Sequence, residues 1–142
     1  MGLRDFRRQL IERFAQSFDI KAWDALKNCL AKNVFTDYSA LRGTPPETMT
    51  GERFVELRRQ ALQHLQTEHA PQKREFTIQG DNATAKVEML ITRRNDQGEV
   101  FNTHCEYTFG LSRIDGSWLI RSIVQKVIAN EGNSKIHQGV VK

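Results

Sequence analysis

The sequence predicts an α+β domain in which amino-terminal helices pack in a curved antiparallel β-sheet that forms an open cone. Two observations lead to this fold class. In the first half of the chain, apolar residues recur every three or four positions, as they do on one face of a helix. From Thr67 onward, turn sequences separate runs of about 12 residues in which apolar and polar residues alternate, as they do along strands. A chain of 142 residues has the length of one domain.

Three helices are predicted in the first half. The first carries its apolar face on Leu3, Phe6, Leu10, Ile11, Phe14 and Phe18. A second, shorter helix runs from about Lys21 to Leu30. A short strand at Val34 to Leu41 and a loop, "RGTPPETMTG", separate it from the third. Thr50 is a suitable N-cap for the third helix, whose apolar stripe consists of Phe54, Leu57, Ala61, Leu62 and Leu65.

The remainder is expected to form an antiparallel meander of four long strands. The turn sequences "QGDN", "NDQG" and "IDGS" separate these strands, and the last strand runs from Trp118 to Ile128. We expect residues 1–130 to form the single domain and residues 131–142 to form a loose tail, because periodicity ends near Asn130. A sheet curled around helices encloses an interior, so the sequence predicts an apolar pocket of ligand size.

Composition limits the classes of partner. The net charge is +4, but basic residues are dispersed among acidic ones, so we expect no nucleic-acid binding. No apolar run approaches the roughly 20 residues that span a bilayer, and no signal peptide is visible, so we expect a cytoplasmic protein without a membrane partner. Cys29 and Cys105 lack metal-site spacing and are expected to be reduced thiols.

The order of these elements, ending in "SRIDGSWLI", resembles the SnoaL-like branch of the nuclear-transport-factor-2-like (cystatin-like cone) superfamily over about Arg4 to Ala129. "SFDIKAWDAL" resembles the junction that supplies the buried aspartate of scytalone dehydratase, and "TEH" resembles the segment that supplies its catalytic histidine. The resemblance implies that Asp19 and His69 hold these positions, and hexachlorocyclohexane dehydrochlorinase uses a comparable pair. It also implies that Tyr38, in "TDYSAL", is a pocket tyrosine that polarises a carbonyl.

Elementary chemistry agrees with such a trio. A histidine with a pKa near 6.5 is largely free at neutral pH to take a proton from a carbon beside a carbonyl. A carboxylate on its other ring nitrogen fixes the tautomer, and a tyrosine hydroxyl stabilises the developing enolate. Asp19, His69 and Tyr38 would then need no metal and no organic cofactor.

Five further residues are predicted to bind substrate. Phe18 stands where scytalone dehydratase has a tyrosine, and Tyr107 and Phe109 are expected in the pocket wall. His104 falls close to a second catalytic histidine of the dehydratase, although strand alternation places it on the opposite face unless a bulge intervenes. Arg121 either lines the pocket for an anionic substrate or pairs on the surface.

The residues also permit plainer interpretations. Asp19 is equally suited to cap the second helix. The plainer interpretation of His69 is a surface position beside the bend at Pro71, but the motif favours the pocket. Tyr38 is equally suited to be a packed aromatic of a strand. For His104, a position facing solvent or an interface is favoured over the pocket.

The leading functional prediction is a small cofactor-independent lyase or isomerase. Its His–Asp pair would take a proton from a hydrophobic cyclic or polyketide-like carbonyl compound. The alternative is a non-catalytic small-molecule-binding or oligomerisation module, such as an accessory subunit, because one fold serves many functions. The apolar face of such a sheet also leads us to expect a homodimer or a homotrimer.

Overall fold

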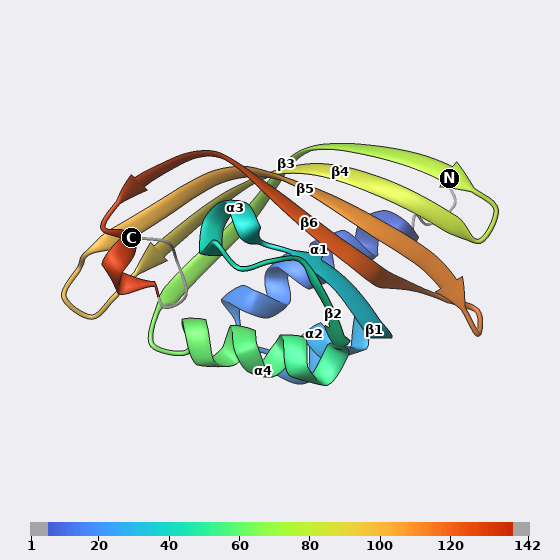
Figure 1. The fold of residues 1–142 in the computed structure, drawn as a ribbon, viewed down its shortest axis with the longest axis horizontal. Coiled ribbons are helices and arrows are strands. Elements are labelled where there is room, and N and C mark those ends of the chain that lie inside the picture. Colours follow the sequence, from blue (N-terminus) through green and yellow to red (C-terminus); the bar gives the residue numbers. More distant parts are fainter. Residues whose placement is uncertain (1–5, 138–142) are drawn as a thin grey trace.

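A strongly curved six-stranded sheet arches over the helices (Figure 1). The computed structural model describes residues 6–137. The elements follow one another along the chain as α1 (Phe6–Asp19), α2 (Trp23–Asn28), β1 (Leu30–Asp37), α3 (Ser39–Arg42), β2 (Glu47–Thr50), α4 (Gly51–Leu62), β3 (Gln66–Gln79), β4 (Asn82–Arg94), β5 (Val100–Ile114), β6 (Ser117–Gly132) and the 3-10 helix η1 (Ser134–Ile136). The predicted α+β class is confirmed.

The sheet is mixed rather than purely antiparallel. Its strand order is β2-β1-β6-β5-β4-β3, and β3 to β6 form the predicted antiparallel meander. β1 pairs with β6 in the parallel direction, which corrects the expected all-antiparallel sheet. The meander could be predicted because its turns are short and local. The pairing of β1 with β6 joins segments that are far apart in the sequence, so no local pattern indicates it.

The segment between the second and third helices differs most from expectation. β1 begins at Leu30 and ends at Asp37, and the chain then turns into α3, which closes at Gly43 in the left-handed conformation (φ 71°). Part of the predicted loop forms strand β2, which pairs with β1. The predicted N-cap is confirmed, because Thr50 Oγ1 accepts a 3.1 Å hydrogen bond from the backbone N–H of Arg53.

The core lies between the helices and the concave face of the sheet. The apolar stripe of α1 supplies Phe14, whose ring meets that of Phe109 on β5 edge-to-face with centroids 5.1 Å apart. The largest fully buried side chains are Phe14, Phe54, Phe101, Phe109, Ile11, Leu26, Leu65, Met89, Ile91, Leu111, Ile120 and Ile123. Each of β4 and β5 alternates buried and more exposed positions over most of its length, as a sheet with one covered face requires.

The segment expected to be a loose tail is packed where the structure describes it. β6 continues to Gly132, η1 follows, and Ile136 and His137 are both buried. Ile136 joins the hydrophobic core, which explains why a segment without periodicity is held in place. Residues 138–142 of the predicted tail lie outside the described residues.

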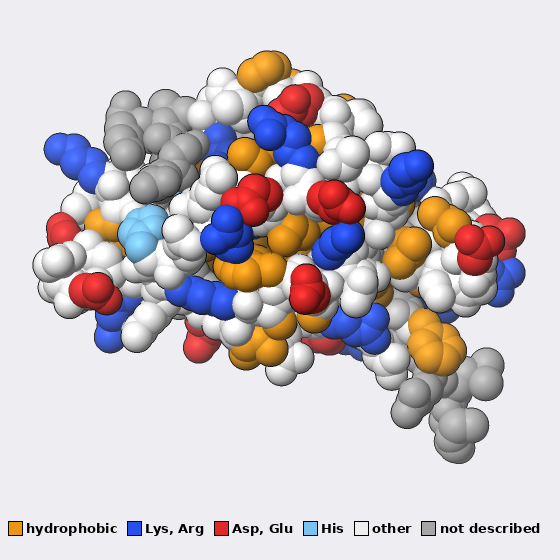
Figure 2. Space-filling model, turned by 90° about the horizontal axis from the view of Figure 1, so that it is seen from below, with side chains coloured by type: hydrophobic (Ala, Val, Ile, Leu, Met, Phe, Trp, Pro, Cys, Tyr) orange, Lys and Arg blue, Asp and Glu red, His pale blue; other side chains and the backbone are white. Residues whose placement is uncertain are grey.

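The helix side of the molecule carries charges of both signs. Figure 2 shows Lys and Arg side chains interspersed with Asp and Glu over this face, with hydrophobic atoms between them. Within residues 6–137, no helix is both long enough and apolar enough to cross a membrane.

Candidate active site

The end of α1 positions Asp19 beside β3. The helix stops there because Lys21 takes the left-handed conformation (φ 56°), and the Ala22 N–H donates back to the Ser17 carbonyl at 2.9 Å. Lys21 Nζ also donates to the Gln63 carbonyl at 2.6 Å, which ties this turn to the end of α4. Asp19 does not cap the second helix, since the N-cap of α2 is Ala22 and has no side-chain cap.

Asp19 accepts three hydrogen bonds from β3. Its Oδ1 lies 2.7 Å from His69 Nδ1 and 3.1 Å from Thr67 Oγ1. Its Oδ2 accepts the backbone N–H of His69 at 2.7 Å. The His69 side chain is 5% exposed and that of Asp19 is 22% exposed. The structure therefore brings the predicted pair together, and His69 is not a surface histidine.

The contacts define the state of the His69 ring. A carboxylate only accepts hydrogen bonds, so Nδ1 carries the proton that it donates to Asp19. Burial lowers the pKa of His69 below its ordinary value of 6.5, and this effect exceeds the opposing influence of the Asp19 hydrogen bond and charge. The imidazole is then neutral at neutral pH. Its Nε2 has a free lone pair and no hydrogen-bond partner among the described residues.

Phe18 holds the plane of this ring. The two rings stack with centroids 4.7 Å apart and an interplanar angle of 23°. Phe18 is the residue immediately before Asp19, so the last turn of α1 supplies both the carboxylate and the stacking surface. A stacked, hydrogen-bonded imidazole has little freedom to rotate.

A narrow cavity adjoins His69 beneath the curved sheet. It is lined by Phe18, Tyr38, Leu41, Arg42, Arg58, Leu62, His69, Ile91, Arg93, Tyr107, Gln125 and His137. About 20 Å³ of it is open to the centre of a water molecule, which is room for about one water. The predicted pocket is therefore present, but it is smaller and more polar than expected. A ligand of several ring atoms would require the lining side chains to move.

Two tyrosines share this cavity. Burial raises the pKa of both Tyr38 and Tyr107, so each hydroxyl keeps its proton at neutral pH. Tyr107 Oη accepts a 3.2 Å hydrogen bond from Gln125 Nε2, whereas Tyr38 Oη is buried without a partner in the described part of the chain. Tyr38 is thus a packed aromatic whose hydroxyl is still available as a donor.

Three residues predicted to bind substrate do not line the cavity. Phe109 lies behind Tyr107, on which it stacks with a centroid separation of 5.2 Å. His104 is on the outer face, where its Nε2 lies 2.6 Å from Glu88 Oε2. The register of β5 against β6 does shift next to His104, yet the side chain still points outward. Arg121 is exposed and donates to Ser112 Oγ at 2.9 Å, which corresponds to the surface alternative.

The prediction from sequence missed three arginines. Arg42, Arg58 and Arg93 all line the cavity. A signal for two of them is present in the sequence. Arg58 occupies the apolar stripe of α4 between Phe54 and Leu62, and Arg93 continues the inward alternation of β4 after Ile91. Charged residues are rarely buried in proteins, so the residue type argues against a core position even where the spacing indicates one.

Within residues 6–137, no group of three or more His, Cys, Asp and Glu side chains is arranged to hold a metal ion. The polar side chains around the cavity are instead the neutral imidazole of His69, the imidazole of His137, the amide of Gln125, two neutral phenols and three guanidinium groups. Chemically, such a set can accept a proton at Nε2 and donate hydrogen bonds to a negatively charged oxygen.

Comparison with known proteins places the chain in a family. The sequence pattern of the SnoaL-like domain matches residues 7–124. The chain belongs to the SnoaL-like domain family. Over 42 residues, this SnoaL-like protein is 43% identical to a scytalone dehydratase-like protein from Passalora fulva, a match that covers 30% of this chain and 26% of that protein. The chain thus matches only about a quarter of the curated relative's length.

Solved structures agree on the fold of this SnoaL-like protein. A protein from Kribbella flavida superposes with a TM-score of 0.87 at 19% identity, covering 92% of this chain and 93% of that one. A type 2 hexachlorocyclohexane dehydrochlorinase gives 0.78 at 14% identity, covering 93% and 89%. A nuclear-transport-factor-2-like protein with a cystatin-like fold from Novosphingobium aromaticivorans gives 0.71 at 16% identity, covering 92% and 84%. The predicted SnoaL-like domain and the predicted cystatin-like fold are confirmed.

Proposed function

We propose that this SnoaL-like protein is a cofactor-independent lyase or isomerase in which His69 takes a proton from a carbon next to a carbonyl. The observation that carries the proposal is the buried contact between Asp19 Oδ1 and His69 Nδ1, which leaves Nε2 of a cavity-lining residue free to act as a base. Neighbours by sequence and fold include a scytalone dehydratase-like protein and a dehydrochlorinase, which are lyase-type enzymes, and they support the same class of chemistry.

The proposed reaction is a dehydration of a β-hydroxy carbonyl compound. His69 Nε2 takes the proton, and the electron pair of the broken C–H bond moves into the carbonyl to form an enolate. Asp19 stabilises the imidazolium that results, and the Tyr38 hydroxyl donates to the enolate oxygen. The enolate then re-forms the carbonyl and expels the β-hydroxyl, which takes the proton from His69 and leaves as water. The products are an unsaturated carbonyl compound and water, and the electron count needs no oxidant or reductant.

The first half of this reaction can be tested without knowing the natural substrate. Proton abstraction makes a ketone exchange its α-hydrogens in deuterium oxide, which proton NMR follows directly. We expect the protein to accelerate exchange in at least one member of a panel of small cyclic ketones. His69→Gln is expected to slow that exchange by about 10²–10⁴-fold, the usual contribution of a general base.

A second histidine provides a matched control. His104 also contacts a carboxylate, that of Glu88, but the pair lies on the outer face of the sheet. The exchange rate with His104→Gln is expected to equal that of the unaltered protein. Equal rates for His69→Gln and the unaltered protein would exclude His69 as the base.

A binding module without catalytic activity is the second candidate, and the small free volume of the cavity favours it. It predicts that members of the ketone panel bind, with chemical-shift changes at residues around the cavity, while none exchanges its α-hydrogens faster than in buffer.

A further inference from the structure

Three positive charges converge on the cavity next to His69. Arg42 ends α3, Arg58 lies in the middle of α4, and Arg93 lies near the end of β4. Arg58 is 6% exposed and Arg93 is 3% exposed. None of the three forms an ion pair with a carboxylate in the part of the chain that the structure describes. Buried guanidinium groups in proteins are normally paired, so this arrangement calls for a negative partner.

The contacts that these arginines do make are with aromatic rings and neutral oxygens. The guanidinium of Arg58 lies 4.8 Å from the centroid of Tyr38 and 5.0 Å from that of Phe54. Arg93 donates to Thr103 Oγ1 at 2.9 Å and to the Phe101 carbonyl at 3.4 Å. These contacts orient the groups but leave the charge uncompensated.

The arginines also repel one another. Burial, and then the charge of Arg58, lower the pKa of Arg42 to about 9, and burial lowers that of Arg93 to about 10. Both values still leave the groups protonated at neutral pH. Arg58 keeps its charge as well, because a guanidinium group is not deprotonated in proteins, so three like charges surround one small space.

Unused hydrogen-bond donors lie in the same place. Within residues 6–137, Arg42 Nε, Arg58 Nε and Tyr38 Oη are buried and have no partner. All three are donors, since guanidinium nitrogens only donate and the Tyr38 hydroxyl keeps its proton. Donors together with uncompensated positive charge are suited to an anion rather than to a neutral carbonyl. A carboxylate is the small planar anion whose two oxygens fit the fork of an arginine, and aromatic rings flank the narrow space that it would enter.

We propose that this cavity recognises a carboxylate group on its ligand, with Arg58 as the principal partner and Arg42 and Arg93 as supporting charges. The inference that this ligand is the substrate rests on the proposed function. The carboxylate would then anchor a cyclic, largely apolar molecule so that its acidic carbon lies near His69 Nε2. The apolar part of this ligand would pack against Phe18, Leu62 and Ile91, which also line the cavity.

Two probes of the same shape and different charge test this proposal. 4-Fluorobenzoate and 4-fluorobenzamide are titrated into the full chain and followed by fluorine NMR, in a buffer without other carboxylates or phosphate. We expect the benzoate to bind at least about tenfold more tightly than the benzamide, because hydrogen bonds to a charged group contribute about 1.5–3 kcal/mol. Arg58→Met is expected to abolish this preference.

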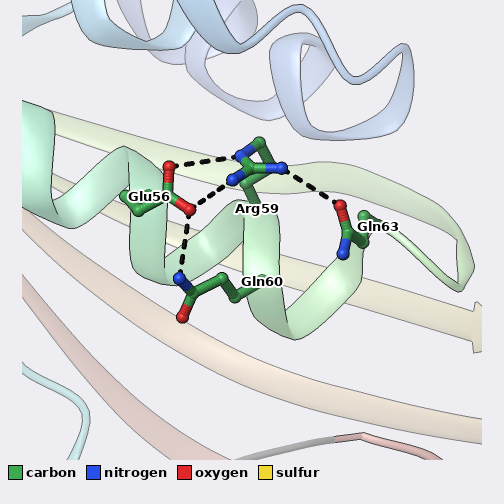
Figure 3. A network of polar contacts seen from close by, with 4 residues as sticks. All are labelled: Glu56, Arg59, Gln60 and Gln63. Atoms are coloured by element: carbon green, nitrogen blue, oxygen red, sulfur yellow. Dashed lines mark hydrogen bonds and ion pairs between the residues drawn. The ribbon is translucent and has the colours of Figure 1, made fainter.

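The same helix offers a matched control. The side chain of Arg59, the next residue of α4, is 42% exposed and contacts Glu56 and Gln63, as Figure 3 shows. Arg59→Met removes the same charge from the same helix and should keep the preference for benzoate. Arg93→Met provides a second cavity variant, and circular dichroism verifies that each variant is folded.

Three results would overturn the proposal: equal affinity for the two probes, binding of neither up to the solubility limit of the benzoate, or a preference that survives Arg58→Met. His69→Gln separates this proposal from the proposed function. That variant keeps all three arginines and should still prefer benzoate, even if no ketone shows exchange with the unaltered protein.

Discussion

Arg58→Met should make the ligand-free protein more stable while it removes the affinity for carboxylates. Arg58 is 6% exposed, its Nε has no hydrogen-bond partner and it has no carboxylate partner among the described residues, so folding removes water from its charge without supplying an opposite charge. That desolvation costs several kcal/mol in real proteins. The variant also loses the contacts with the Tyr38 and Phe54 rings, each worth about 0.5–2 kcal/mol. Methionine retains much of the apolar packing of the arginine stem.

The difference between these effects is an expected gain of about 1–3 kcal/mol in the free energy of unfolding, similar to the gains seen when buried charges are replaced by apolar residues. For a chain of this length, each kcal/mol raises the midpoint of thermal unfolding by about 3–5 °C. Urea unfolding, followed by circular dichroism at low ionic strength without carboxylate buffers, measures this gain directly.

Arg59→Met is again the control. Its partner Glu56 lies on the exposed side of α4, and such surface ion pairs contribute only about 0.2–1 kcal/mol (Figure 3). This variant should therefore lose at most about 1 kcal/mol. Saturating benzoate should stabilise the unaltered protein and leave Arg58→Met unchanged. If Arg58→Met proves less stable than the unaltered protein without ligand, the charge of Arg58 is compensated in the folded state and the reasoning is refuted.

Three further predictions concern the Asp19–His69 pair. Asp19→Asn should lower the free energy of unfolding by about 2–4 kcal/mol, because three hydrogen-bond donors of β3 lose a charged acceptor. Urea unfolding measures this loss, and a loss below about 0.5 kcal/mol would contradict the prediction. The α-hydrogen exchange rate should rise with pH through an apparent pKa below 6.5 and stay level above it, since burial depresses the pKa of His69; a midpoint above 7 would contradict a buried neutral base. The same shift has a stability consequence with a defined sign: the unfolded chain binds a proton at His69 before the folded chain does. The free energy of unfolding should therefore fall as pH falls below 6.5, and less steeply in His69→Gln.

The sequence predicted those parts of the fold that depend on local patterns. The meander was predictable because alternation and turn residues lie next to one another in the chain. β2 was not, because four residues in a Pro-containing stretch become a strand only through pairing with β1. The packing of the carboxyl-terminal end was not predictable either, because Ile136 joins the core although the sequence around it has no hydrophobic periodicity.

The candidate site was predictable to a different extent. Asp19 and His69 were found through two short resemblances and a chemical argument, although 50 positions separate them. The charge of the cavity was not foreseen, because position and residue type gave conflicting indications at Arg58 and Arg93. A charged residue at a position that the hydrophobic pattern assigns to the core departs from that pattern. The reason for the departure is visible only in the three-dimensional structure, where several such residues line one cavity.

The hydrogen bonds between Asp19 and β3 have a consequence for interpreting related sequences. This carboxylate holds a backbone amide and a threonine hydroxyl as well as the imidazole, so it fastens the opening helix to the sheet whether or not any reaction takes place. A descendant that had given up the chemistry would still be under selection to keep the aspartate. Among such relatives, an aspartate at the position of Asp19 is therefore weak evidence for catalysis. Replacement of the histidine at the position of His69 is the change that would indicate a loss of activity.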